Sequence, residues 1–136
     1  MDNKELILEK IVTGYIVAML WSSCETHPTS GDDLESLEDF EPSQELKEKA
    51  LEICTEFYNK NESDCILFSE QYQPSQNFDV WECLGHDLWL TSAGHGVGFW
   101  DRGLSELGDR LTEACKEKYC RDKSAYLGDD LLIYLG

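Results

Sequence analysis

The fold expected from the sequence is decided by the stretch from Gly85 to Arg102, which is GHDLWLTSAGHGVGFWDR. Apolar residues alternate with other residues over 86–92 and again over 95–101, which is the period of a half-buried β-strand. The Ala93-Gly94 step between the two runs is typical of a tight turn. The stretch therefore predicts a β-hairpin with a core face made of Leu88, Leu90, Val97 and Phe99.

The other face of this predicted hairpin has two large rings, Trp89 and Trp100. On this face the partner strand offers Gly96 and Gly98, so a large ring can lie across a neighbour that has no side chain. His86 and Asp101 would meet at the open end of the core face. A three-residue loop is the alternative connection, and it would turn one strand over and disrupt the alternation.

Helical spacing of apolar residues predicts four helices around this hairpin, at 4–21, 43–59 with Ser43 as the N-cap, 62–72 and 105–119. One helical turn over 78–84 would lead into the hairpin, and Gly108 is expected to mark a close approach to it. Two further strands surround the turn Gly128-Asp129-Asp130 and are expected to extend its sheet. The sequence thus predicts an α+β fold, with N-terminal helices on a small antiparallel sheet. We expect one domain over 1–136, mainly helical over 1–77 with an acidic loop at 22–42, and hairpin-helix-hairpin over 78–136.

Several short motifs in the second half of the chain form a signature. They are Gly85-His86-Asp87, Trp89-Leu90-Thr91, Gly94-His95-Gly96, the run from Gly98 to Leu104, the run from Gly108 to Ala114, and Gly128-Asp129-Asp130. The chain resembles, through these residues, a family of small proteins encoded mainly by bacteriophages. Ser92-Ala93-Gly94 departs from the Arg-Asn-Gly usual in that family, which removes a basic residue and leaves the turn type open. The resemblance implies a phage gene product acting in the cytoplasm of a bacterial host, and it implies no particular reaction.

Charge is the dominant global property of the chain. It has 28 acidic residues against 11 lysines and arginines, a formal net charge of −17. Proteins that bind nucleic acids or anionic membranes need basic residues to neutralise phosphates, so this balance argues against direct contact with either. The expected partner is a host or phage protein with a basic surface.

The acidic residues accumulate in two long intervals that contain no lysine or arginine, from Lys10 to Lys47 and from Asn61 to Asp101. We expect the chain to bind the nucleic-acid groove of its partner, and so to inhibit it, as a DNA mimic would. Such mimicry needs carboxylates spaced like phosphates, about 6–7 Å apart. A charge that serves only solubility is the alternative. The predicted partner-binding residues are Asp32, Asp33, Glu35, Glu38, Asp39 and Glu41, with Glu62, Asp64 and Glu70 as a second group.

The competing hypothesis is an enzyme, hydrolase-like or metal-binding, built on His86, Asp87, His95, Asp101 and Arg102. Pairs of a histidine and a carboxylate also occur in ordinary sheets, where the carboxylate accepts a hydrogen bond from a half-buried imidazole. Arg102 could equally clamp Asp87 or Asp109 and tie the hairpin to the following helix. No nucleophile motif and no close thiolate pair is present, so the sequence favours a structural role and predicts no catalytic residue, metal or cofactor.

The cysteines and the N-terminal stripe complete the expectations. Six cysteines occur without a Cys-x-x-Cys pair, and no export signal or membrane-spanning run is evident, so reduced thiols in an intracellular protein are expected. Cys54 and Cys115 fall on apolar helix stripes. The stripe of the 4–21 helix predicts a core helix, with a homodimer contact as its alternative.

Overall fold

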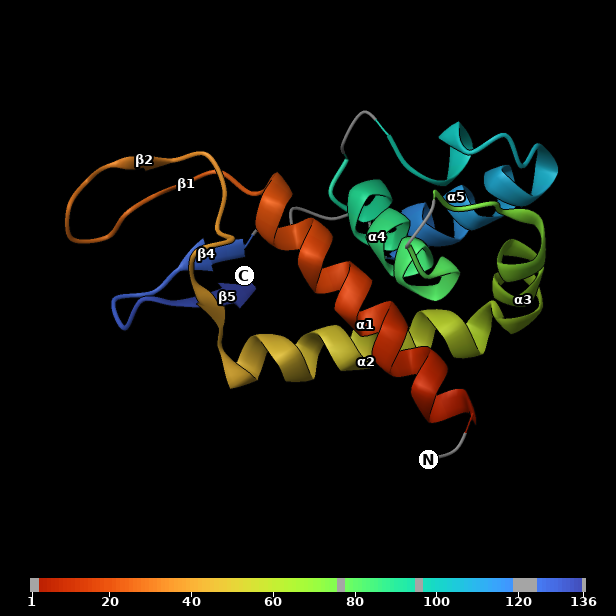
Figure 1. Cartoon of the computed structure of the whole chain (residues 1–136), viewed down its shortest axis with the longest axis horizontal. Helices are drawn as coiled ribbons and strands as arrows, with labels where there is room; N and C mark the ends of the chain where they lie inside the picture. The colour runs from red at the N-terminus through yellow and green to blue at the C-terminus, as the bar shows by residue number, and fades with distance from the viewer. Residues whose placement is uncertain (1–2, 76–77, 95–96, 119–124, 136) are drawn as a thin grey trace.

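The computed structural model describes residues 3–75, 78–94, 97–118 and 125–135. These residues form five α-helices, one 3-10 turn and two small sheets (Figure 1). The helical elements are α1 (Asn3–Ser22), α2 (Gln44–Lys60), α3 (Glu62–Gln71), α4 (Val80–Ser92), η1 (Phe99–Asp101) and α5 (Glu106–Lys118). The strands are β1 (Glu25–Thr26), β2 (Asp33–Leu34), β3 (Glu41–Pro42), β4 (Ala125–Leu127) and β5 (Leu132–Leu135). The α+β class predicted from the sequence is confirmed.

The central hairpin predicted from the sequence is wrong. Residues 86–92 belong to α4, and the chain then enters a loop that ends in η1. Asp79 begins α4, because its carboxylate accepts hydrogen bonds from the backbone N–H groups of Trp81 and Glu82. The helix therefore extends the single turn expected at 78–84 through the whole first half of the predicted hairpin.

Helix α4 was mistaken for a strand because it is enclosed on nearly all sides. Every residue from 87 to 92 is buried, so the helix has no polar face to reveal the 3.6-residue period. A short apolar run of this kind cannot be assigned to strand or helix from periodicity alone. The alternation of Leu88 and Leu90 was therefore a coincidence of composition.

Two glycines allow α1 and α4 to cross with their backbones in contact. A Cβ built on Gly85 would lie 1.9 Å from the carbonyl oxygen of Ile11, and one built on Gly14 would lie 1.8 Å from the carbonyl oxygen of Glu82. Any larger residue at either position would force the helices apart. This crossing is the most extensive contact between elements of the fold.

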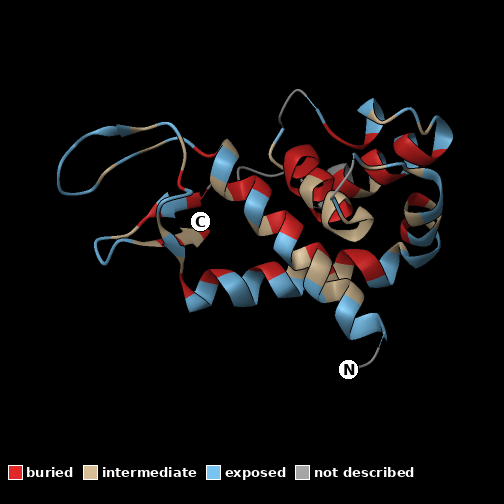
Figure 2. Ribbon diagram, in the orientation of Figure 1, coloured by how far each residue is buried: buried red, intermediate tan, exposed pale blue. Residues whose placement is uncertain are grey.

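The core is built from aromatic rings that α1, α2, α3 and η1 contribute around α4, and Figure 2 shows the buried surfaces of the helices turned toward one another. Trp89 packs edge-on against Tyr15 at a centroid distance of 5.6 Å, and its indole N–H donates to the Ser22 hydroxyl at 2.8 Å. Phe99 stacks on Phe57 and meets Phe68 edge-on. Trp89 is thus a core residue, whereas the sequence placed it over a glycine on the outer face of a hairpin.

The sequence predicted the remaining helices well. Helices α1, α2, α3 and α5 lie within one or two residues of the expected ranges, and the Ser43 hydroxyl accepts from the backbone N–H of Leu46 as the expected N-cap. The predicted close approach at Gly108 also occurs, although to η1: a Cβ there would lie 2.8 Å from the carbonyl oxygen of Phe99. The Trp100 ring packs against Gly98, but within one loop segment, so the predicted packing of a ring across a hairpin is wrong.

The C-terminal hairpin predicted from the sequence is present as β4 and β5. It does not extend a central hairpin. Instead β5 pairs in parallel with β3, which joins the end of the acidic 22–42 segment to the C-terminal part of the chain and makes this sheet mixed. Strands β1 and β2 pair only with each other, as a separate antiparallel ribbon.

No disulfide joins the described cysteines, which are Cys24, Cys54, Cys65, Cys83 and Cys115, while Cys120 lies outside the described residues. Cys54 and Cys115 are buried, as their place on apolar stripes predicted. Burial, followed by the charges of Asp64 and Glu62, raises the pKa of Cys65 to about 12. None of the described helices combines the length and the apolar character that crossing a membrane requires.

Candidate functional site

A pocket of about 480 Å³ opens between α1, α4 and the segments that flank α4 in the sequence. Trp21 and Val17 of α1 form one wall, and His86 and Glu82 of α4 form another. Tyr72 and Phe78, from the chain between α3 and α4, line it together with Arg102. Its volume lies in the range typical of small-molecule sites.

The N-terminus of α4 is fixed to α1 by Asp79. The Lys10 ammonium donates to the Asp79 carboxylate at 2.9 Å, and the same carboxylate caps α4. Partial burial acts to raise the pKa of Asp79. The hydrogen bonds from Lys10 and from the backbone N–H groups of Trp81 and Glu82 outweigh it and lower the pKa. The Asp79 carboxylate thus fixes the start of α4, the helix that contributes several residues to the lining of the pocket.

Replacing Asp79 by Ala should lower the free energy of unfolding by about 1–2 kcal/mol, because both the cap and the ion pair are lost. Urea denaturation measures this change. Asp79→Asn keeps a capping oxygen and should lose less. Because the folded-state pKa of Asp79 is lowered, its contribution is complete at neutral pH and disappears as the pH falls through that pKa, so wild type and Asp79→Ala should converge in acid. An unchanged difference at low pH would contradict this assignment.

His86 is held in the pocket by Trp21 and not by Asp101. The Trp21 indole N–H donates to His86 Nε2 at 2.9 Å, and the two rings lie 5.6 Å apart. Burial lowers the pKa of His86, so the imidazole is neutral at neutral pH with its proton on Nδ1. The predicted meeting of His86 with Asp101 is wrong, because the two residues belong to α4 and η1 and not to a hairpin, and no contact between them is found among the described residues. His95 lies outside the described residues.

Asp87 and Arg102 form a buried ion pair at the inner end of the pocket. Arg102 Nε donates to one carboxylate oxygen at 2.9 Å and Nη2 to the other at 2.6 Å. Asp87 is 1% exposed. Burial raises the pKa of the Asp87 carboxyl and the bonds from Arg102 oppose that rise, while the carboxylate raises the pKa of Arg102. Of the two clamps predicted for Arg102, the one to Asp87 is confirmed, and Asp109 is an exposed residue of α5.

These contacts describe a binding pocket better than a catalytic centre. Both oxygens of Asp87 are engaged by Arg102, and His86 Nε2 is engaged by Trp21. Burial and the charge of Asp87 raise the pKa of Cys83, so its thiol is protonated and not an activated nucleophile. Among the described residues, no three His, Cys, Asp or Glu side chains are arranged to hold a metal ion.

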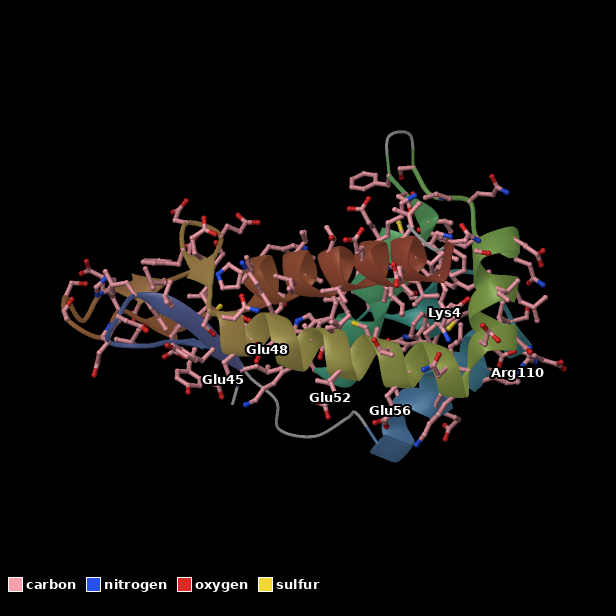
Figure 3. All side chains as sticks on the ribbon, turned by 90° about the horizontal axis from the view of Figure 1, so that it is seen from below. Lys4, Glu45, Glu48, Glu52, Glu56 and Arg110 are labelled. Atoms are coloured by element: carbon pink, nitrogen blue, oxygen red, sulfur yellow. The ribbon has the colours of Figure 1, made fainter. Side chains whose placement is uncertain are left out.

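The acidic 22–42 segment projects from one end of the molecule, beside the β4–β5 turn (Figures 1 and 3). All six carboxylates predicted there to bind a partner are exposed: Asp32, Asp33, Glu35, Glu38, Asp39 and Glu41. Of the second group, Glu62 and Glu70 are exposed on α3. Asp64 is already engaged, because its carboxylate accepts hydrogen bonds from Arg110 at 3.0–3.2 Å.

Helix α2 adds a row of carboxylates that the sequence analysis missed. Figure 3 shows Glu45, Glu48, Glu52 and Glu56 along one side of the helix. Their spacing in the sequence, three, four and four residues, is the signal that could have revealed the row. Glu45 lies 3.4 Å from Lys49, and Glu56 lies 3.5 Å from Lys60. The Glu45–Lys49 pair is exposed, and exposed pairs of this kind are weak and leave the carboxylate available to another cation, whereas Glu56 is half-buried.

Comparisons with known proteins identify no relative of this chain. No family model matches the chain, and neither a curated protein nor a solved structure shows significant similarity to it. The α+β fold, the pocket beside α4 and the exposed carboxylates therefore define what the molecule offers a partner.

Proposed function

We propose that this chain is a phage accessory protein that acts in the bacterial cytoplasm by binding a protein with a basic, nucleic-acid-binding surface. The binding surface is the acidic tract, which we define as the exposed carboxylates of residues 32–56. It runs from the projecting 22–42 segment through β3 and along α2. Occupation of the partner's groove would exclude nucleic acid and inhibit the partner.

The observation that supports this proposal most directly is the row on α2. Residues three or four apart on a helix are separated by about 4.5–6 Å along its axis, close to the roughly 6–7 Å between successive phosphates of one DNA strand. Glu41 of β3, which is exposed, precedes the first glutamate of the row by four residues in the sequence. A basic groove that accommodates a phosphate backbone would meet carboxylates at a similar repeat.

The balance of charge determines how such a complex would form. A net charge of −17 on 136 residues attracts basic surfaces over several ångströms and accelerates encounter. Added salt screens this attraction, with a Debye length of about 10 Å at 0.1 M ionic strength. The complex should therefore weaken steeply as salt rises, and duplex DNA should compete with the chain for its partner.

The test is capture of partners from lysate of a bacterial host by the immobilised chain at low and raised salt, with and without duplex DNA. The tract variant neutralises four carboxylates by Asp33→Asn, Glu41→Gln, Glu48→Gln and Glu52→Gln. A matched control neutralises four exposed carboxylates elsewhere by Glu5→Gln, Glu9→Gln, Glu106→Gln and Asp109→Asn. We expect the tract variant to bind a captured basic protein at least about tenfold more weakly than the control, because several charge contacts are lost together.

The outcomes separate three explanations. Loss in the tract variant alone, with release by duplex DNA, supports mimicry. Equal loss in both charge variants would mean that net charge alone acts, and would contradict the proposal. Loss with His86→Ala while the tract variant still binds would place the interaction at the pocket, and would contradict it as well.

A further inference from the structure

An exposed apolar patch surrounds the pocket beside α4. Phe78 is 67% exposed, Val17 49% and Trp21 42%, and all three line the pocket. Phe78 comes from the chain before α4, whereas the other two come from α1, so the patch is assembled by the fold and not by one helix. Apolar groups that converge on a cavity are typical of binding sites, whereas scattered exposed apolar residues need no explanation.

The charges in this pocket do not cancel. Asp87 and Arg102 neutralise each other through their two hydrogen bonds. His86 is neutral at neutral pH because burial lowers its pKa. Glu82 is half-buried, and no hydrogen bond or ion pair of its carboxylate is found among the described residues. The pocket thus contains one unbalanced negative charge, next to aromatic side chains.

We infer that this pocket binds an organic cation, an alkylammonium or guanidinium group on an apolar stem. Trp21, Tyr72 and Phe78 supply the aromatic lining that attracts such cations through the electrons of their ring faces. Glu82 supplies the counter-charge. Anions are disfavoured because the guanidinium of Arg102 already has its carboxylate, and a neutral apolar ligand would leave Glu82 unpaired.

Two sources can supply such a cation. One is a free small molecule, for which a volume of about 480 Å³ is ample. The other is an arginine or lysine side chain of a protein. The pocket is formed by α1, α4 and Arg102, and the acidic tract by residues 32–56, so this inference does not depend on the proposed function.

The experiment is a titration of the full chain followed by NMR, with the Trp21 indole N–H signal as the reporter because this group lines the pocket and bonds to His86. The probes are n-butylammonium and n-butylguanidinium, with 1-butanol as the neutral analogue and butyrate as the anionic one. Blocked lysine and arginine, acetylated and methylamidated, represent protein side chains. We expect both butyl cations to bind about tenfold more tightly than 1-butanol, and butyrate not to bind.

Two variants test whether the Glu82 carboxylate supplies the counter-charge. Glu82→Gln should weaken cation binding about tenfold and leave 1-butanol unaffected, whereas Glu106→Gln, at an exposed position of α5, should change neither. Spectra of both variants establish that they are folded. Blocked lysine or arginine binding as tightly as the butyl cations would support a protein side chain as the ligand, and weaker binding would support a free cation.

Equal binding of 1-butanol and the cations, an unchanged affinity in Glu82→Gln, or preferential binding of butyrate would each overturn the inference.

Discussion

Gly85→Ala should lower the free energy of unfolding by about 3 kcal/mol or more, because the added methyl group would overlap the backbone of the neighbouring helix. The added Cβ would lie 1.9 Å from the carbonyl oxygen of Ile11 and 2.8 Å from the backbone nitrogen of Tyr15. Both obstacles are helix backbone, which cannot rotate aside as a side chain can. Helices α1 and α4 must separate, and the core contacts between them are weakened.

The sign of this effect distinguishes packing from helix propensity. Alanine is favoured over glycine in a helix interior by about 1 kcal/mol, so propensity alone would stabilise the variant. Urea denaturation of Gly85→Ala, Gly14→Ala and Gly108→Ala provides a graded series. The first two should be strongly destabilised, and Gly108→Ala less so, because its added Cβ would meet one backbone oxygen at 2.8 Å.

Glu48→Ala, at an exposed position of α2, serves as the control and should change stability by less than about 0.5 kcal/mol. Stabilisation of Gly85→Ala would show that α1 and α4 do not cross at these glycines.

The sequence predicted the helices that have one polar and one apolar face. Helix α2 is an example, because its buried residues Leu46, Ala50, Cys54 and Phe57 recur every three or four positions while most of the residues between them are exposed. Its N-cap at Ser43 was equally predictable. These features depend on local spacing and local hydrogen bonds, which a single sequence displays directly.

Helix α4 could not be predicted in the same way, because its environment is created by the fold. Surrounded by α1, α3, α5 and η1, it buries polar residues such as Asp87 and Thr91 as well as apolar ones. Its N-cap at Asp79 was not predicted, because the run that follows also satisfied the strand period. Two glycines of the predicted hairpin stretch have other roles in the structure. Gly85 allows the crossing of two helices, and Gly98 accommodates the Trp100 ring.

Only part of the site was predictable, because His86, Asp87 and Arg102 were candidate site residues whereas the other residues that line the pocket were not. The pairing of Arg102 with Asp87 was foreseen from their proximity in the sequence, although on the wrong secondary structure. The contact between Trp21 and His86 joins residues 65 positions apart and requires the crossing at Gly14 and Gly85. No local pattern encodes such a contact, so a single sequence cannot reveal the pocket that it closes.

Asp87→Ala should cost about 3–5 kcal/mol of stability, because it leaves the guanidinium of Arg102 without its carboxylate in a largely buried place. The side chain of Arg102 is 24% exposed and that of Asp87 is 2% exposed, so water can replace only part of the lost interaction. Arg102→Ala leaves an unpaired buried carboxylate and should cost a similar amount. The double variant should cost less than the sum of the two, because no charge then remains buried alone.

A second pair in the same chain provides the matched control. Arg110 contacts Asp64 with the same fork of nitrogens, but at the surface, where its side chain is 49% exposed. Asp64→Ala should therefore cost less than about 1 kcal/mol. Thermal or urea unfolding of the three single variants and the Asp87→Ala/Arg102→Ala double variant measures both pairs. If Asp87→Ala cost no more than Asp64→Ala, burial would not be what makes the inner pair important, and Asp87 could not be the anchor of the pocket's inner end.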